Sequence, residues 1–190
     1  MRVKTSWMRL PTERRRIVAF FAAACLFLAS VEYAIPKPVP FMRLGLANLP
    51  VLLSLEVLGP LSVMLLALLK VCGQGLIRGS LFSHVFLLSL LGSTSSTAAM
   101  LVMRRMFGRR VSLVGISVMG ALVNNLVQTA LARYLIFGKR AWLIAPPLLL
   151  VGTITSLALG LFAQRFARRS TWLKRLTAQL DGLPENACQS

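Results

Sequence analysis

The chain alternates long apolar runs with short segments that are basic or contain proline and glycine. The first run covers about residues 17–35. Pro36 and Pro38 end its helix, because each proline lacks a backbone N–H and disfavours helical angles in the residue before it. A helix that crosses a membrane needs about 20 apolar residues, and several of the runs provide them. The pattern therefore predicts an all-α integral membrane protein.

The number of spans depends on the segment 44–71, which is too long for one ordinary span and too short for two full ones. Gly59-Pro60 interrupts it. Cytoplasmic loops carry an excess of Lys and Arg. A turn at Gly59-Pro60 gives six spans and places 15 of the 22 basic residues inside, whereas five spans divide them equally. We therefore expect both termini in the cytoplasm, and short second and third helices that are tilted, kinked or shielded by neighbours. The expected spans are residues 17–35, 44–58, 61–77, 80–103, 111–137 and 142–162.

Composition agrees with a membrane location. Of all residues, 56% are hydrophobic and 14% are charged, whereas an average soluble chain has roughly 45–50% and 25%. The formal net charge of +17 comes from basic clusters between the apolar runs, and membrane orientation explains these clusters without nucleic acid. The three cysteines are far apart and lack the spacing of a zinc or redox site, so we expect them to be packing residues.

Three regions follow from these patterns. We expect a basic cytoplasmic N-terminus over residues 1–16, a membrane domain over 17–162 and a basic cytoplasmic tail over 163–190. The tail is partly amphipathic, with Trp172, Leu173 and Leu176, which favours a helix at the cytoplasmic membrane surface. The sequence thus predicts a multi-pass protein of the cell membrane.

Polar residues inside the spans are informative, because an ionised side chain at mid-bilayer costs about 2.5–3.5 kcal/mol. Glu32 lies near the outer end of the first span, where it either meets a ligand or reaches interfacial water. The fifth span carries small and polar residues on one helix face. Its amides either bind a polar ligand or hold helices together, at about 0.6–2 kcal/mol per hydrogen bond. This stripe consists of Ser117, Gly120, Ala121, Asn124, Asn125, Gln128 and Ala132.

The fourth and sixth spans carry similar stripes, which favour close helix packing. The fourth includes Gly92 and Ser93, and the sixth includes Gly152 and Gly160. His84, near the outer end of the fourth span, is the only histidine. A single histidine without carboxylates or cysteines at ligand spacing predicts no metal site.

Several catalytic motifs are absent from the sequence. There is no phosphate loop ending in Gly-Lys-Ser/Thr, so we do not expect this chain to be the ATPase of a pump. Asp181 is the only aspartate, whereas magnesium-dependent chemistry on diphosphates needs several converging carboxylates. We therefore expect a protein that is not an enzyme and has no cofactor of its own.

Three blocks of sequence resemble a known family. They are residues 43–50 (RLGLANLP), residues 79–83 with 86–92 (GSLFS and FLLSLLG), and residues 115–121 (GISVMGA) continuing to Asn125 and Gln128. The blocks are similar to the family called heptaprenyl diphosphate synthase component I or Gx transporter, which is related to the S components of energy-coupling factor (ECF) transporters. The similarity covers about residues 38–162. Asn124 and Val127 stand where that family often has His and Gly, which implies a different ligand specificity.

The resemblance implies a six-transmembrane-helix bundle like an ECF S component, with an outward-opening substrate pocket. It also implies assembly with a transmembrane coupling protein and two cytoplasmic ATP-binding subunits. In such S components, small residues of the first helix contact the coupling protein. Ala19 and Ala23, one turn apart, suit that role.

We therefore expect a substrate-binding subunit of an uptake transporter. Arg43, Arg78 and Arg133 fall near the outer face, which suggests an anionic or carboxylate-bearing small molecule, although arginines there also anchor lipids. Two alternatives remain open: a noncatalytic membrane accessory of a prenyl diphosphate synthase with an acidic soluble partner, and a scaffold without a ligand. The candidate binding residues are Glu32, Arg43, Asn48, Arg78, His84, Asn124, Asn125 and Gln128.

Overall fold

The computed structural model describes residues 12–34, 45–77, 79, 81, 83–134, 141–173 and 175–176. Every regular element in these ranges is helical, which confirms the predicted all-α class. The elements are α1 (Thr12–Ala34), the 3₁₀ turn η2 (Leu46–Asn48), α2 (Leu49–Ser54), α3 (Pro60–Ile77), α4 (His84–Phe107), the 3₁₀ turn η3 (Gly108–Arg110), α5 (Leu113–Ala132) and α6 (Ala141–Arg169).

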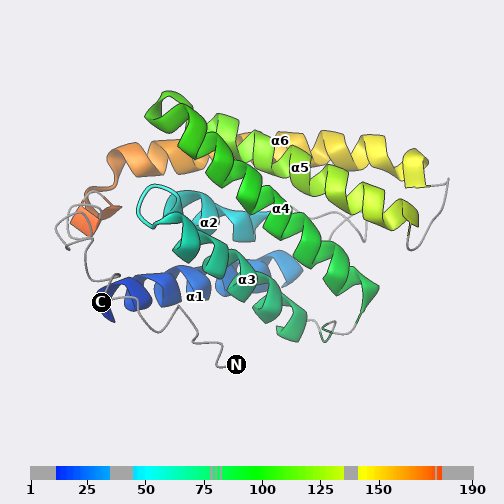
Figure 1. Ribbon diagram of the computed structural model, residues 1–190, viewed down its shortest axis with the longest axis horizontal. Coiled ribbons are helices and arrows are strands. Elements are labelled where there is room, and N and C mark those ends of the chain that lie inside the picture. Colours follow the sequence, from blue (N-terminus) through cyan, green and yellow to red (C-terminus); the bar gives the residue numbers. More distant parts are fainter. Residues whose placement is uncertain are drawn as a thin grey trace, which may run out of the picture.

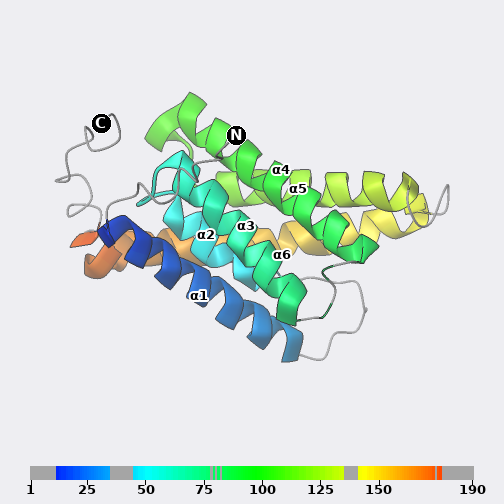
Figure 2. The ribbon, with the colours of Figure 1, turned by 60° about the horizontal axis from the view of Figure 1, so that its bottom comes forward.

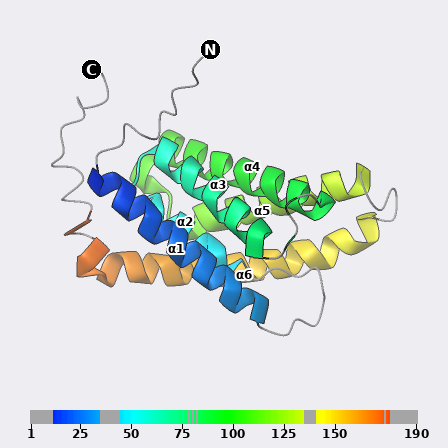
Figure 3. The ribbon, with the colours of Figure 1, turned by 90° about the horizontal axis from the view of Figure 1, so that it is seen from below.

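The helices alternate in direction. In Figure 1, α1, α3 and α5 run one way along the bundle, and α2, α4 and α6 run the opposite way. The start of α1 and the end of α6 therefore lie at the same end of the molecule, as Figures 1, 2 and 3 all show. α5 lies beside α6 along most of its length, and α1 lies beside α3 (Figures 1 and 2).

Five of the helices are long and apolar enough to cross a membrane, namely α1, α3, α4, α5 and α6. The predicted count of six spans is not confirmed, because the second expected span, 44–58, is not among these five. α2 has only six residues and is therefore about 9 Å long at 1.5 Å per residue, far less than the bilayer core of about 30 Å. The predicted break is present, because a turn over 55–58 follows α2 and α3 begins at Pro60. Proline is favoured at the start of a helix, where its missing N–H has no partner to lose.

α2 is enclosed by the other helices. All residues from Pro50 to Ser54 are buried, and the segment contacts α1, α3, α5 and α6. Since the flanking helices cover it, this short apolar segment has little surface for lipid. The expectation that the second helix is shielded by neighbours agrees with this arrangement.

An apolar core fills one half of the bundle. It combines the first part of α1, α3 and α5 with the last part of α4 and α6, and these parts meet because the helices alternate in direction. Leu66 and Ile116 are fully buried in it. The core includes Val18, Phe21, Cys25, Val51, Leu52, Leu53, Leu58, Val63, Met100, Leu113 and Ala163.

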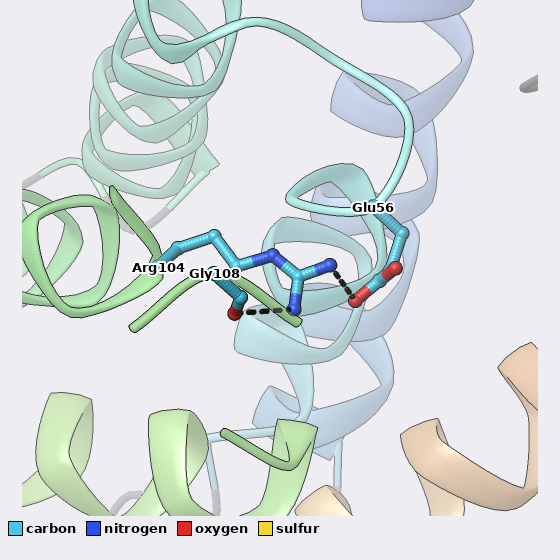
Figure 4. A network of polar contacts seen from close by, with 3 residues as sticks. All are labelled: Glu56, Arg104 and Gly108. Atoms are coloured by element: carbon cyan, nitrogen blue, oxygen red, sulfur yellow. Dashed lines mark hydrogen bonds and ion pairs between the residues drawn. The ribbon is translucent and has the colours of Figure 1, made fainter. Parts of the chain in front are cut away.

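Basic side chains gather at the same end of the bundle as this core. Arg14, Arg15 and Arg16 lie in the first turns of α1, and the last turns of α4 and α6 carry Arg104, Arg105, Arg168 and Arg169. We call this the basic end. Glu56, in the turn after α2, is beside it: Arg104 donates to Glu56 Oε1 at 2.7 Å and to the carbonyl of Gly108 at 3.4 Å (Figure 4).

The chain after α6 folds back onto the bundle. The ring of Trp172 lies 5.5 Å from that of Phe20 in α1, and Leu173 is buried in the apolar core with Leu176 packed against it. The predicted amphipathic segment is thus helical at 171–173 and 175–176. It packs Leu173 and Leu176 on protein, whereas Trp172 stays 46% exposed. The rest of the predicted tail lies outside the described residues.

Candidate functional site

A polar cavity occupies the half of the bundle away from the basic end. Its volume is about 90 Å³, which holds several water molecules at about 10–15 Å³ each. Glu32 of α1, Lys70 and Gln74 of α3, Gln128 of α5 and Val151 of α6 line it. The other lining residues come from 45–52, from the middle of α4 and α5, and from 152–159: Gly45, Ala47, Asn48, Leu49, Leu52, Ser89, Ser93, Ser96, Met100, Ser117, Ala121, Asn124, Asn125, Gly152, Thr155, Ser156 and Leu159.

Lys70 and Glu32 bring opposite charges to one side of this cavity. The Lys70 ammonium donates to Asn48 Oδ1 and, at 3.2 Å, to Ser93 Oγ. The backbone N–H of Leu46 donates to Glu32 Oε2 at 3.0 Å. Both charged side chains are buried, with exposed fractions of 6% for Lys70 and 3% for Glu32. Buried charges persist in a low-dielectric interior only with such partners.

A pair of amides forms another wall. Asn124 and Gln128 lie one turn apart on α5, and Gln128 Nε2 donates to Asn124 Oδ1 at 3.0 Å. Gly92 of α4 makes room for them, since a Cβ added there would lie 2.6 Å from Asn124 Oδ1. Gly152 of α6 does the same for Asn125, with a Cβ only 2.2 Å from Asn125 Nδ2. The glycines therefore allow α4 and α6 to approach the polar face of α5.

The same stripes also hold the helices together. Ser96 of α4 donates to the carbonyl of Gly120 in α5 at 2.7 Å, and Ser117 of α5 donates to the carbonyl of Ser156 in α6 at 2.9 Å. Such bonds stabilise helix association in membranes by about 0.6–2 kcal/mol. The stripe of the fifth span thus joins helices through Ser117, and its amides line the cavity. Ligand binding by these amides stays a prediction.

The cavity brings together five of the eight predicted binding residues: Glu32, Asn48, Asn124, Asn125 and Gln128. His84 is exposed at the start of α4 and does not line the cavity, and its role in binding stays a prediction. Arg43 and Arg78 lie outside the described residues.

Two further predictions concern residues away from the cavity. Arg133, from which an anionic ligand was inferred, is exposed, and its guanidinium lies 6.0 Å from the ring centre of Tyr134. Ala19 and Ala23 are exposed on α1, so they lie on an outer helix face of this chain. Their contact with a partner protein stays a prediction.

Lys70 and Gln74 are two of the polar cavity residues that sequence reasoning missed. Lys70 was counted only as a basic residue outside the membrane, yet it lies in the middle of α3 with apolar neighbours on both sides. A charged residue inside an apolar span is by itself a signal of a functional or paired group. Gln74 follows Lys70 by four residues, so both lie on the same face of α3.

Comparison with known proteins identifies one family. The model of the family described as heptaprenyl diphosphate synthase component I matches residues 21–166, which includes most of the helices described above. No curated protein and no solved structure matches the chain. A family model that covers this much of the chain decides its membership. The chain belongs to the heptaprenyl diphosphate synthase component I family.

Proposed function

We propose that this chain is the membrane-embedded substrate-binding subunit of an ECF-type uptake transporter for a small polar molecule. The observation that carries the proposal is the buried polar cavity, which has 22 lining residues, including Lys70, Glu32 and five amides. Burying two charges costs free energy in a low-dielectric interior, and their position in the cavity wall makes them available to a polar ligand.

The arrangement of core and cavity supports uptake from outside. The apolar core closes the half of the bundle at the basic end, and the cavity lies in the other half. Because basic residues prefer the cytoplasmic side, the basic end faces the cytoplasm in this proposal. Both termini are then cytoplasmic, and the cavity is nearer to the outer surface.

A binding subunit of this kind needs partners that supply energy and movement. We propose a transmembrane coupling protein on the exposed face of α1, which carries Ala19, Ala23, Phe20 and Phe27. Small residues on that face allow another helix to approach closely. Two cytoplasmic ATP-binding subunits complete the proposed assembly, and this chain itself carries out no catalysis.

The family name favours a second candidate function. It describes a component of a heptaprenyl diphosphate synthase, and a component implies a protein partner. In that case the chain is a noncatalytic membrane subunit, and its basic end presents arginines such as Arg105 and Arg169 to an acidic soluble synthase. The name supports this candidate directly, whereas the cavity supports the transporter.

Affinity purification separates the two candidates. The tagged full-length chain is purified in mild detergent from its native membrane, and proteins and small molecules are identified by mass spectrometry. Co-purification of a membrane coupling protein with ATP-binding subunits, together with a retained small molecule, is the expected result. Recovery of a soluble prenyl synthase without a coupling protein would overturn the transporter and establish the second candidate.

A matched pair of variants assigns any retained molecule to the cavity. Ala121 lines the cavity, so Ala121→Phe fills it. Ala130 is exposed on the same helix, so Ala130→Phe adds the same volume outside. The small molecule should be lost from Ala121→Phe and kept by Ala130→Phe, and its retention by both would place it elsewhere.

A further inference from the structure

The charges in the cavity indicate which class of molecule it binds. Among the described lining residues, Glu32 is the one carboxylate and Lys70 the one cation. Before any ligand enters, the wall therefore carries one negative and one positive charge. Arg133, one of the three arginines from which an anionic ligand was first inferred, is exposed and does not line the cavity, and the other two, Arg43 and Arg78, lie outside the described residues.

Both charges are attached to one short turn. η2 spans Leu46–Asn48; its first residue donates its N–H to Glu32 Oε2, and the side-chain oxygen of its last residue accepts from the Lys70 ammonium. This turn therefore positions the carboxylate of α1 and the ammonium of α3 relative to each other. Ser93 of α4 holds the ammonium from another helix, so two parts of the bundle fix its place.

We infer that the cavity binds a small zwitterion, with its carboxylate beside Lys70 and its ammonium beside Glu32. This inference rests on the proposed function and names the substrate class of the same site. A ligand without net charge leaves the net charge of the cavity and its described lining at zero. A monoanion adds one buried negative charge without a partner, and a phosphate or diphosphate adds more, each at a cost in free energy.

The rest of the lining agrees with a small, flexible and polar molecule. No Phe, Tyr or Trp is among the described lining residues, so the cavity offers no ring on which a flat ligand can stack. Asn124, Asn125, Gln128 and Gln74 instead provide amide donors and acceptors. These groups suit a hydroxyl or amide on the body of the zwitterion.

Four probes of nearly equal size test the inference. Alanine carries both charges, lactate only the carboxylate, alaninamide only the ammonium, and lactamide neither. Each is added at pH 7 to the purified full-length chain, and the dissociation constant is obtained from the shift in melting temperature. Alanine should bind at least tenfold more tightly than each of the other three.

Two isosteric variants assign each charge to its partner. Lys70→Met should remove the preference for alanine over alaninamide, and Glu32→Gln should remove the preference for alanine over lactate. Glu32→Gln keeps an oxygen for the Leu46 N–H, and Arg133→Gln, at an exposed position, is the control that should change neither preference. The comparison of the four probes on the wild-type chain needs no variant, so a variant that misfolds does not remove the test.

Several outcomes would overturn the inference. Tighter binding of lactate or inorganic phosphate than of alanine, equal binding of all four probes, or binding of none would each do so. If an uncharged or anionic molecule binds the wild type and is excluded by Ala121→Phe, the proposed binding function stands and only the zwitterion fails. If the native protein retains no small molecule and no coupling protein, the proposed function itself fails.

Discussion

Arg104 Nη2 lies 2.7 Å from Glu56 Oε1, and this ion pair joins the last turn of α4 to the turn that follows α2. Both side chains are mostly shielded, with exposed fractions of 18% and 20%. The pair therefore fixes the short α2 segment to a long helix at the basic end of the bundle.

Removing this pair should destabilise the protein modestly. Glu56→Gln and Arg104→Gln should each lower the free energy of unfolding, and the double variant should show a coupling of about 1 kcal/mol, near the upper limit for exposed pairs. A double-mutant cycle measured by thermal unfolding in detergent checks this. Arg105→Gln, at the exposed neighbouring position, is the control. Strictly additive losses would show that the two charges do not interact.

Gly160 should tolerate no side chain. A Cβ there would lie 2.9 Å from the backbone Cα of Val114 in α5, so Gly160→Ala must push α5 and α6 apart, at about 1–3 kcal/mol. Gly115→Ala is the matched control, because its Cβ would meet only the movable side chain of Val111 at 3.3 Å and the hydroxyl of Ser112 at 3.8 Å. The stability of both variants is measured by denaturation with SDS. Equal stability of the two variants would contradict the prediction.

Leu173 should stabilise the packing of the chain after α6. Its side chain is buried in the apolar core, so Leu173→Ala should cost about 2–5 kcal/mol and make residues 170–173 accessible to protease. Limited proteolysis and thermal unfolding measure the effect. Thr171→Ala changes an exposed neighbour and should be neutral. Wild-type protease resistance in Leu173→Ala would mean that this segment is held by other contacts.

Asn124 should contribute directly to binding. Asn124→Ala removes a cavity amide and leaves Gln128 without its partner at 3.0 Å, so the affinity for the molecule that co-purifies with the chain should fall about tenfold, equivalent to about 1.4 kcal/mol. Arg133→Ala should leave that affinity unchanged, because Arg133 is exposed. Equilibrium binding to both variants checks this. A loss of affinity in Arg133→Ala but not in Asn124→Ala would instead place the binding site at the outer arginines.

The helical class and much of the cavity are readable from the sequence because both depend on local periodicity. Apolar run length predicts a spanning helix, and polar residues at intervals of three and four predict a shared face, as at Asn124 and Gln128. Residues 44–71 are too short for two full spans, and two spans were counted there from charge distribution. That count does not depend on helix length. It has no means of detecting that α2 is only six residues long.

Lys70 and His84 show where sequence reasoning fails within the site. Counting basic residues toward membrane orientation placed Lys70 on the outer side, although it lies within the expected span 61–77. Its partners Asn48 and Ser93 lie 22 and 23 positions away in the chain. Such pairings depend on tertiary packing, which no local pattern reports. His84 was included as a residue near the outer end of the fourth span, but at the first position of α4 it is exposed and does not line the cavity.

The brevity of α2 has a consequence for how the protein is made. A segment of six residues has too little length to enter the lipid alone, while its flanking helices α1 and α3 are each long and apolar enough to do so. In two-stage assembly, independently stable helices insert first and then associate. α2 therefore reaches its place during association, and with it η2, which positions Glu32 and Lys70. We therefore expect completion of the candidate site to be a late event of biogenesis.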